Sequence, residues 1–135
     1  IKAIAVARKN ANILNCSNQI NFIKCNLLEK ISTYDIVVSN PPYLSNSEYY
    51  NMSPGIRLYE PKVALLAKDN GYEFYTKISV FLKDILKCDS RAFIEIGSKQ
   101  AKKTINILKL KNINCSKVVK DLQNLDRLLI LNKSC

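Results

Sequence analysis

A run of β-branched residues that ends at two consecutive prolines constrains this chain more than any other segment. Residues 34–39 read YDIVVS, and residues 40–43 (NPPY) follow directly. A compact apolar run is typical of a strand buried on both faces of a parallel sheet. Proline lacks an N–H and disfavours helix in the residue before it, so the strand is expected to stop at Asn40.

Helical and extended patterns alternate around this strand. Apolar side chains recur every three or four residues in three segments, which predicts amphipathic helices at residues 1–15, 75–85 and 98–111. Further strands are predicted at residues 20–24, 91–96, 115–119 and 128–131. This alternation favours an α/β layer fold with a mostly parallel sheet, whose ligands bind beyond the carboxyl ends of the strands. Residues 44–69, which show little periodicity, are expected to form a long functional or mobile loop.

The composition restricts the chemistry. The 135 residues suit one domain, and histidine is absent, which excludes imidazole bases and His-ligated metals. The five cysteines form no C-x-x-C pair, so free thiols are expected. No apolar run approaches the length needed to cross a bilayer, so a cytoplasmic protein without a membrane partner is expected. No metal is expected either, because histidine and paired cysteines are absent.

The net charge of +10 admits two interpretations. It would suit an anionic partner such as RNA or a ribosome-bound factor. The lysines are scattered along the chain, however, and an abundance of Lys, Asn and Ile is typical of an AT-rich genome. The charge therefore leaves both interpretations open.

The NPPY segment carries the chemistry. Because Pro41 and Pro42 have no N–H, the segment offers mainly acceptors: the carbonyls of Asn40 and Pro41 and the Asn40 side-chain oxygen. These acceptors suit a planar NH2 group, which the ring of Tyr43 could cover. An amide or exocyclic amine is a weak nucleophile, so orientation rather than a strong base would lower the barrier. The alternative is a proline-rich turn that merely ends a strand.

SNPPY after an apolar strand resembles the signature of S-adenosylmethionine-dependent methyltransferases that act on planar nitrogens, in adenine or in glutamine. Three later segments, R-x-Y-E-P at 57–61, A-L at 64–65 and D-x-G at 69–71, resemble the HemK/PrmC family. That family methylates the Gly-Gly-Gln glutamine of peptide chain release factors. Residues 7–11, residues 95–97 with Gln100, and Asp121 with Arg127 resemble further family blocks, so the likeness covers the whole chain. Tyr59 before Glu60 favours the release-factor branch over the ribosomal-protein branch.

The resemblance implies a Rossmann-like class I methyltransferase fold, with release factors as partners. It implies that the Asn40 side chain and the Pro41 carbonyl are the catalytic groups that hold the substrate amide. Pro42 and Tyr43 would complete the substrate pocket. Glu60 is expected to brace the loop, and Arg57 and Arg127 to pair with carboxylates.

The resemblance also implies S-adenosyl-L-methionine as cofactor, contacted by Asn26, Leu27 and Asn40. Asn26 departs from the family, which usually has an acidic residue there. The three glycines cannot form a G-x-G-x-x-G loop. The family's Gly-rich motif, first strands and N-terminal recognition domain would thus precede Ile1. Residues 1–135 are therefore expected to be the C-terminal part of a catalytic domain, weak or inactive when isolated.

Two alternatives stay open. An N6-adenine methyltransferase would use the basic charge and Tyr43 as a stacking platform, although the block at 57–61 argues against it. A basic fragment without enzymatic activity could bind RNA or nothing. Under the favoured interpretation, direct binding of nucleic acid is not expected.

Overall fold

A mixed four-stranded sheet organises residues 2–24 and 32–134, which are the residues that the computed structural model describes. The strands are β1 (Tyr34–Ser39), β2 (Leu86–Glu95), β3 (Ile113–Lys120) and β4 (Asp126–Lys133), in the spatial order β1-β2-β4-β3. β1 and β2 are parallel, whereas β4 is antiparallel to both β2 and β3. The α/β class is confirmed, but the described sheet is mixed where a mostly parallel one was expected.

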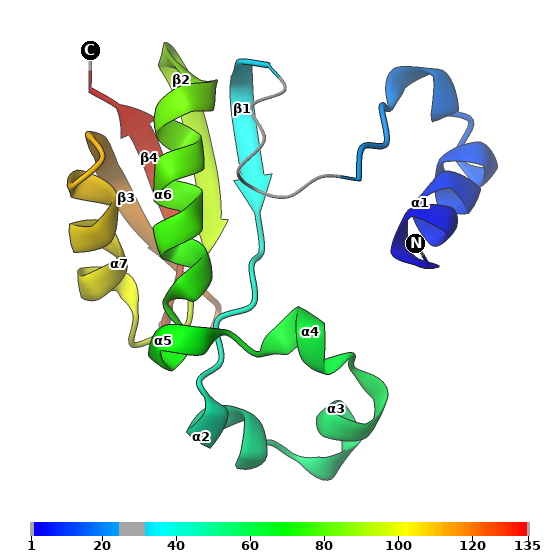
Figure 1. Cartoon of the computed structure of the whole chain (residues 1–135), viewed down its shortest axis with the longest axis horizontal. Helices are drawn as coiled ribbons and strands as arrows, with labels where there is room; N and C mark the ends of the chain where they lie inside the picture. Colours follow the sequence, from blue (N-terminus) through cyan, green and yellow to red (C-terminus); the bar gives the residue numbers. More distant parts are fainter. Residues whose placement is uncertain (1, 25–31, 135) are drawn as a thin grey trace.

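Two helices, α6 (Glu73–Ile85) and α7 (Ala101–Lys109), lie side by side over one face of this sheet (Figure 1). The buried side chains of α6 recur at helical spacing and meet the alternating buried residues of β2 and β4. They are Tyr75, Ile78, Leu82 and Ile85 on the helix, and Ala92, Ile94, Leu129 and Leu131 on the strands. Each fully buried Leu or Ile contributes about 1.5–3 kcal/mol, so this layer is the core. The predicted helices and the strands at β1 to β4 are confirmed.

The opposite face of β1 is open. Ile36 and Val38 are 66% and 75% exposed, whereas Val37 packs against the core. Successive side chains of a strand point to opposite faces, and no helix of the described residues covers the side of Ile36 and Val38. The expectation that this strand is buried on both faces is therefore wrong in this structure.

The N-terminal segment stands apart from the sheet (Figure 1). It contains α1 (Lys2–Ile13) and the short 3-10 helix η1 (Ser17–Gln19). The strand predicted at residues 20–24 is not formed, although Ile20 has extended backbone angles. A strand requires a neighbour for its backbone hydrogen bonds, and none of the described strands lies beside this segment. No helix within the described ranges is long and apolar enough to span a membrane.

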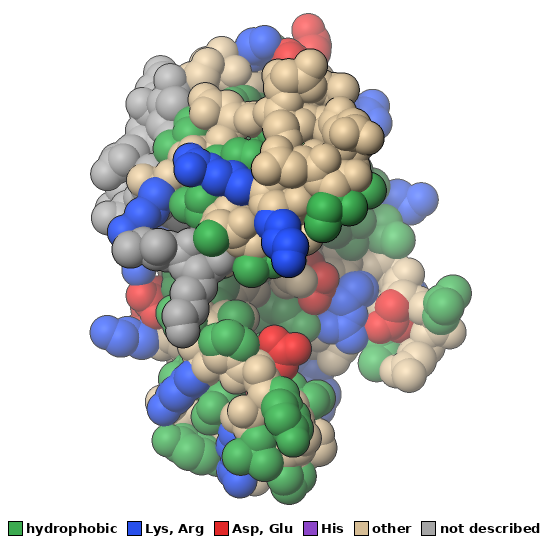
Figure 2. All heavy atoms as spheres, turned by 90° about the vertical axis from the view of Figure 1, so that its right-hand side faces the viewer, with side chains coloured by type: hydrophobic (Ala, Val, Ile, Leu, Met, Phe, Trp, Pro, Cys, Tyr) green, Lys and Arg blue, Asp and Glu red, His purple; other side chains and the backbone are tan. Residues whose placement is uncertain are grey.

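Short helices replace the irregular loop expected at residues 44–69. They are α2 (Asn46–Tyr50), α3 (Pro54–Tyr59), α4 (Lys62–Leu65) and α5 (Lys68–Gly71). A capping box starts α2: the Ser45 hydroxyl accepts from the Glu48 amide, and the Glu48 carboxylate accepts from the Ser45 amide at 2.8 Å. Hydrophobic side chains gather at the end of the molecule where α3 and α4 lie (Figure 2). Helices of one turn carry little hydrophobic periodicity, which explains why the sequence pattern missed them.

The cysteines differ from expectation at one position. Cys16 and Cys115 are free thiols, whereas Cys88 is disulfide-bonded. The prediction of free thiols is therefore wrong for Cys88.

Candidate active site

The NPPY residues lie where the sequence placed them, directly beyond the carboxyl end of β1. Ser39 pairs with Ile94 of β2, so Asn40 and Glu95 follow at the same edge of the sheet. A pocket of about 170 Å³ opens there, and its lining is Asn40, Pro41, Pro42, Tyr43, Leu44, Met52, Ala64, Leu65 and Glu95. Sites for whole small molecules usually measure roughly 300–1,000 Å³. This pocket is therefore of a size for a single side chain rather than for a nucleoside cofactor.

The first two residues of the motif differ in exposure. Asn40 is exposed, and its side-chain amide has no hydrogen-bond partner among the described residues. Pro41, the next residue, is buried. The Asn40 amide is thus available to an incoming group, while its neighbour anchors the loop.

The Tyr43 hydroxyl is held by two charged side chains. It donates to Glu95 Oε1 at 3.2 Å and accepts from Arg127 Nη1 at 3.4 Å. Burial, followed by the Glu95 carboxylate, raises the pKa of Tyr43 above its usual value of 10.0. The phenol therefore stays neutral at physiological pH and fixes the ring as one wall of the pocket.

Arg127 is itself fixed by Asp121. Its guanidinium donates to Asp121 Oδ2 through Nε at 3.2 Å and Nη2 at 3.1 Å, and this hydrogen bonding raises the pKa of Arg127. The backbone amides of Leu125 and Gln123 also donate to the Asp121 carboxylate, and the Leu125 amide is the largest cause of its lowered pKa. The expected pairing of Arg127 with a carboxylate is confirmed.

Glu95 lines the pocket, a role that its place in the family block at residues 95–97 did not reveal. One of its carboxylate oxygens accepts from Tyr43, and the other has no partner within residues 2–24 and 32–134. Its position at the end of a strand parallel to β1 was the available signal, because parallel strands end at the same edge.

The residues around 57–61 behave differently from expectation. Arg57 Nη1 donates to the Tyr50 carbonyl at 3.2 Å and has no carboxylate partner in the described part of the chain. The side chain of Glu60 is exposed and likewise makes no hydrogen bond to any described residue. The expected carboxylate pair of Arg57 and the bracing role of Glu60 are therefore wrong in this structure. The rings of Tyr49 and Tyr50, both in α2, pack edge to face with 5.4 Å between their centroids.

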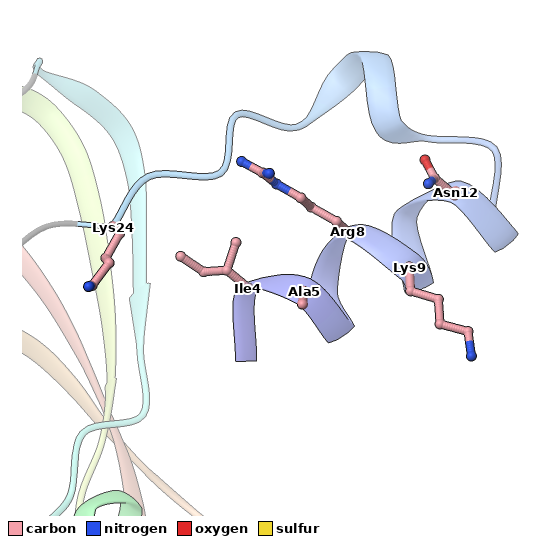
Figure 3. Close-up of a pocket in the computed structure, with 6 residues that line it drawn as sticks. All are labelled: Ile4, Ala5, Arg8, Lys9, Asn12 and Lys24. Atoms are coloured by element: carbon pink, nitrogen blue, oxygen red, sulfur yellow. The ribbon is translucent and has the colours of Figure 1, made fainter. Parts of the chain in front are cut away.

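Of the three predicted cofactor residues, the structure describes one. Asn40 borders the pocket, whereas Asn26 and Leu27 lie outside the described residues. A separate open groove of about 500 Å³ follows α1, and its lining is Ile4, Ala5, Arg8, Lys9, Asn12 and Lys24. Figure 3 shows Ile4 and Arg8 pointing from α1 toward the segment that carries Lys24. No cluster of metal-binding side chains occurs among the residues described.

Curated proteins similar to this chain share one kind of activity in their names. The chain is 40% identical over 136 residues to the release factor glutamine methyltransferase of Fusobacterium nucleatum, covering 98% of this chain and 38% of that protein. It is 36% identical over 135 residues to the enzyme of the same name from Enterococcus faecalis, with coverage of 96% and 47%. A bifunctional methyltransferase of Rickettsia typhi is 36% identical over 131 residues, with coverage of 96% and 25%. The chain thus spans less than half the length of these relatives, and no protein-family model matches it.

Solved structures of methyltransferases share the fold. TrmN from Thermus thermophilus superimposes with a TM-score of 0.61 at 16% identity, covering 98% of this chain and 34% of that one. The mitomycin 7-O-methyltransferase MmcR gives a TM-score of 0.60 at 8% identity, with coverage of 97% and 39%. A TehB-like SAM-dependent methyltransferase from Corynebacterium glutamicum gives 0.51 at 11% identity, with coverage of 92% and 64%. The Rossmann-like fold of class I S-adenosylmethionine-dependent methyltransferases is therefore confirmed.

Proposed function

We propose that this chain shares the activity of the release factor glutamine methyltransferases, the HemK/PrmC family, along the part of their length that it spans. The protein transfers a methyl group from S-adenosyl-L-methionine to the side-chain amide nitrogen of a release-factor glutamine, the one in the Gly-Gly-Gln motif. One observation carries the proposal. The four residues of the NPPY motif line a single pocket whose volume, about 170 Å³, suits an amide side chain.

The acceptor amide is held by hydrogen-bond acceptors. The Asn40 side-chain oxygen and the Pro41 carbonyl each accept one N–H of the substrate amide, as Asn40 has no other partner in the described residues. Both N–H bonds then lie in the plane of the pocket's acceptors, and the face of the nitrogen is turned outward. Orientation of this kind supplies the catalysis that a weak nucleophile requires.

Pro42 and Tyr43 complete the wall of the pocket. The Tyr43 ring is fixed through its hydroxyl by Glu95 and Arg127, so it stays in place when the amide enters. When the nitrogen gains the methyl group it loses one proton, and Glu95 borders the pocket as the acceptor for that proton. Strong basicity is not needed, because a protonated amide is a strong acid.

The cofactor lies outside this small pocket. S-adenosyl-L-methionine, when bound, supplies an electrophilic methyl group. Asn40 stands at the carboxyl end of β1, where ligands of such sheets bind, and its polar amide suits the methionine end of the cofactor. Asn26 and Leu27 would border the adenine, and residues 1–135 would form the C-terminal part of the catalytic domain.

Intact-mass measurement of a purified release factor tests the proposal. The release factor is incubated with S-adenosyl-L-methionine and with this chain or the same reading frame extended upstream. A gain of one methyl group on the Gly-Gly-Gln glutamine is expected with the extended protein. Methylation of adenine in nucleic acid, with none of the release factor, would overturn the proposal.

Asn40→Ala is the informative variant in this assay. Loss of one oriented hydrogen-bond partner is expected to lower turnover by about 1,000-fold. Asn106→Ala, on the exposed side of α7, is the matched control and should transfer methyl groups at the wild-type rate. An active Asn40→Ala enzyme would remove Asn40 from the mechanism.

A further inference from the structure

One buried glutamine ties the NPPY segment to two other parts of the molecule. Gln100, 7% exposed, lies immediately before α7. Its Nε2 donates to the Tyr43 carbonyl at 3.0 Å. Its Oε1 accepts from the Gly97 amide at 2.9 Å and from the Tyr75 hydroxyl at 3.0 Å. The side chain therefore joins the segment after β1 to the segment after β2 and to α6.

Two glycines leave just enough room for this arrangement. A Cβ on Gly71, which has a φ of +90°, would collide with the Tyr43 carbonyl and lie 2.7 Å from Gln100 Nε2. A Cβ on Gly97 would lie 2.7 Å from Gln100 Oε1. The Tyr43 carbonyl and the Gln100 amide are thus packed from both sides and can shift little.

The NPPY segment needs such an anchor because of its prolines. Pro41 and Pro42 cannot donate backbone hydrogen bonds, so neither amide can tie the segment to its surroundings. The Tyr43 carbonyl is the nearest backbone group that a buried side chain holds, and the Tyr43 hydroxyl is held separately by Glu95 and Arg127. Fixing both ends of Tyr43 fixes the position of the residues before it.

We infer that Gln100 is a positioning residue of the acceptor pocket: its Nε2 holds the Tyr43 carbonyl and thereby sets where Asn40 and Pro41 receive the substrate amide. The inference rests on the proposed function for its catalytic consequence. Its structural part, the restraint of the NPPY segment, is measurable without any activity.

Gln100→Glu tests the hydrogen bond from Gln100 to the Tyr43 carbonyl. Glutamate retains an oxygen that accepts from Gly97 and Tyr75, but it lacks the donor that holds the Tyr43 carbonyl. In the protein with its upstream region, kcat is expected to fall by about 100-fold, the size of effect that a misplaced catalytic geometry produces. The KM for the release factor should change less than about 3-fold, since the docking surface is unchanged. Gln19→Glu, the same change at an exposed residue of η1, should leave both constants unaltered.

Hydrogen exchange gives the second readout. The amide of Leu44, which donates to the Leu65 carbonyl at 3.0 Å, is expected to exchange faster in Gln100→Glu and to a smaller extent in Tyr75→Phe, which removes the hydroxyl that donates to Gln100. If Gln100→Glu does not fold, Tyr75→Phe decides the question with its ring and core packing intact. Wild-type exchange at this amide, or a wild-type kcat, would overturn the inference. An inactive wild-type enzyme would overturn the proposed function, and the exchange rates would still decide the role of Gln100.

Discussion

The layer formed by α6, α7, β2 and β4 and the segment at residues 2–24 have similar amphipathic patterns but opposite outcomes. In the layer, Leu82 and Leu131 are completely buried. In the N-terminal segment, Ile13 and Leu14 are 66% and 73% exposed. A periodic pattern therefore identifies the apolar face of an element, while burial also depends on whether a partner face is present.

The residues of the candidate site are likewise distributed between these two regions of the chain. Tyr43 is held by Gln100, Glu95 and Arg127, all of which belong to the packed layer or adjoin it. The acceptor side of the proposed reaction is thus built on the stable part of the molecule. The cofactor residues expected at Asn26 and Leu27 follow the segment that stands apart.

Truncation of one leucine in each region tests the comparison most directly. Leu82→Ala is expected to lower the free energy of unfolding by about 2–5 kcal/mol, because it leaves a cavity in the core. Leu14→Ala removes the same atoms from an exposed side chain and should change it by less than about 0.5 kcal/mol. Urea unfolding followed by circular dichroism measures both values. Equal losses would show that the N-terminal segment is packed in solution.

Two glycines in the region between β1 and α6 differ in the space around them: Gly71 is closely packed and Gly55 is not. Gly71→Ala should destabilise the protein by about 2 kcal/mol, since its positive φ and the nearby Tyr43 carbonyl both oppose a Cβ. Gly55, within α3, has nothing within 4 Å of the position of a Cβ. Gly55→Ala should therefore stabilise the protein by about 0.5–1 kcal/mol. Thermal unfolding of the pair measures the contrast, and a stabilising Gly71→Ala would contradict the packing of Tyr43 against Gly71.

Local patterns predicted α1, α6, α7 and the strands of the sheet because hydrophobic periodicity is strong within each of these elements, but they missed the short helices α2 to α5. They failed at residues 20–24, where strand formation requires a neighbour, and at Ile36 and Val38, whose burial depends on a covering layer. The place of the NPPY motif was predictable because it follows a recognisable strand. The contacts of Tyr43 with Glu95, Gln100 and Arg127 join residues 52, 57 and 84 positions apart, which no local pattern reports.

Arg127 is the link from β4 to the site, so its replacement shows how far the packed layer supports Tyr43. Arg127→Met loses hydrogen bonds to Asp121, Tyr43 and the Ile96 carbonyl. A loss of about 1.5 kcal/mol in unfolding free energy is expected, because the guanidinium is partly exposed and part of its energy is screened. Arg91→Met, at an exposed position of β2, is the matched control and should change stability by less than about 0.5 kcal/mol. Equal effects of the two substitutions would show that the Asp121–Arg127 pair does not stabilise the fold.

The pH dependence of stability gives the smallest expected effect and tests the same link from the side of Asp121. Hydrogen bonds from the Leu125 amide and from Arg127 lower the pKa of Asp121 in the folded protein, whereas the unfolded chain has an ordinary aspartate pKa of about 3.9. Because the pKa of Asp121 is lower in the folded protein than in the unfolded chain, its stabilisation is complete above the unfolded pKa. It is lost as the pH falls from the unfolded pKa through the folded pKa. Asp121→Asn removes this group, so the stability difference between wild type and variant should shrink as the pH falls through that range. Urea unfolding at a series of pH values measures the difference. A constant difference would mean that the Asp121 charge does not stabilise the turn that holds Arg127 beneath Tyr43.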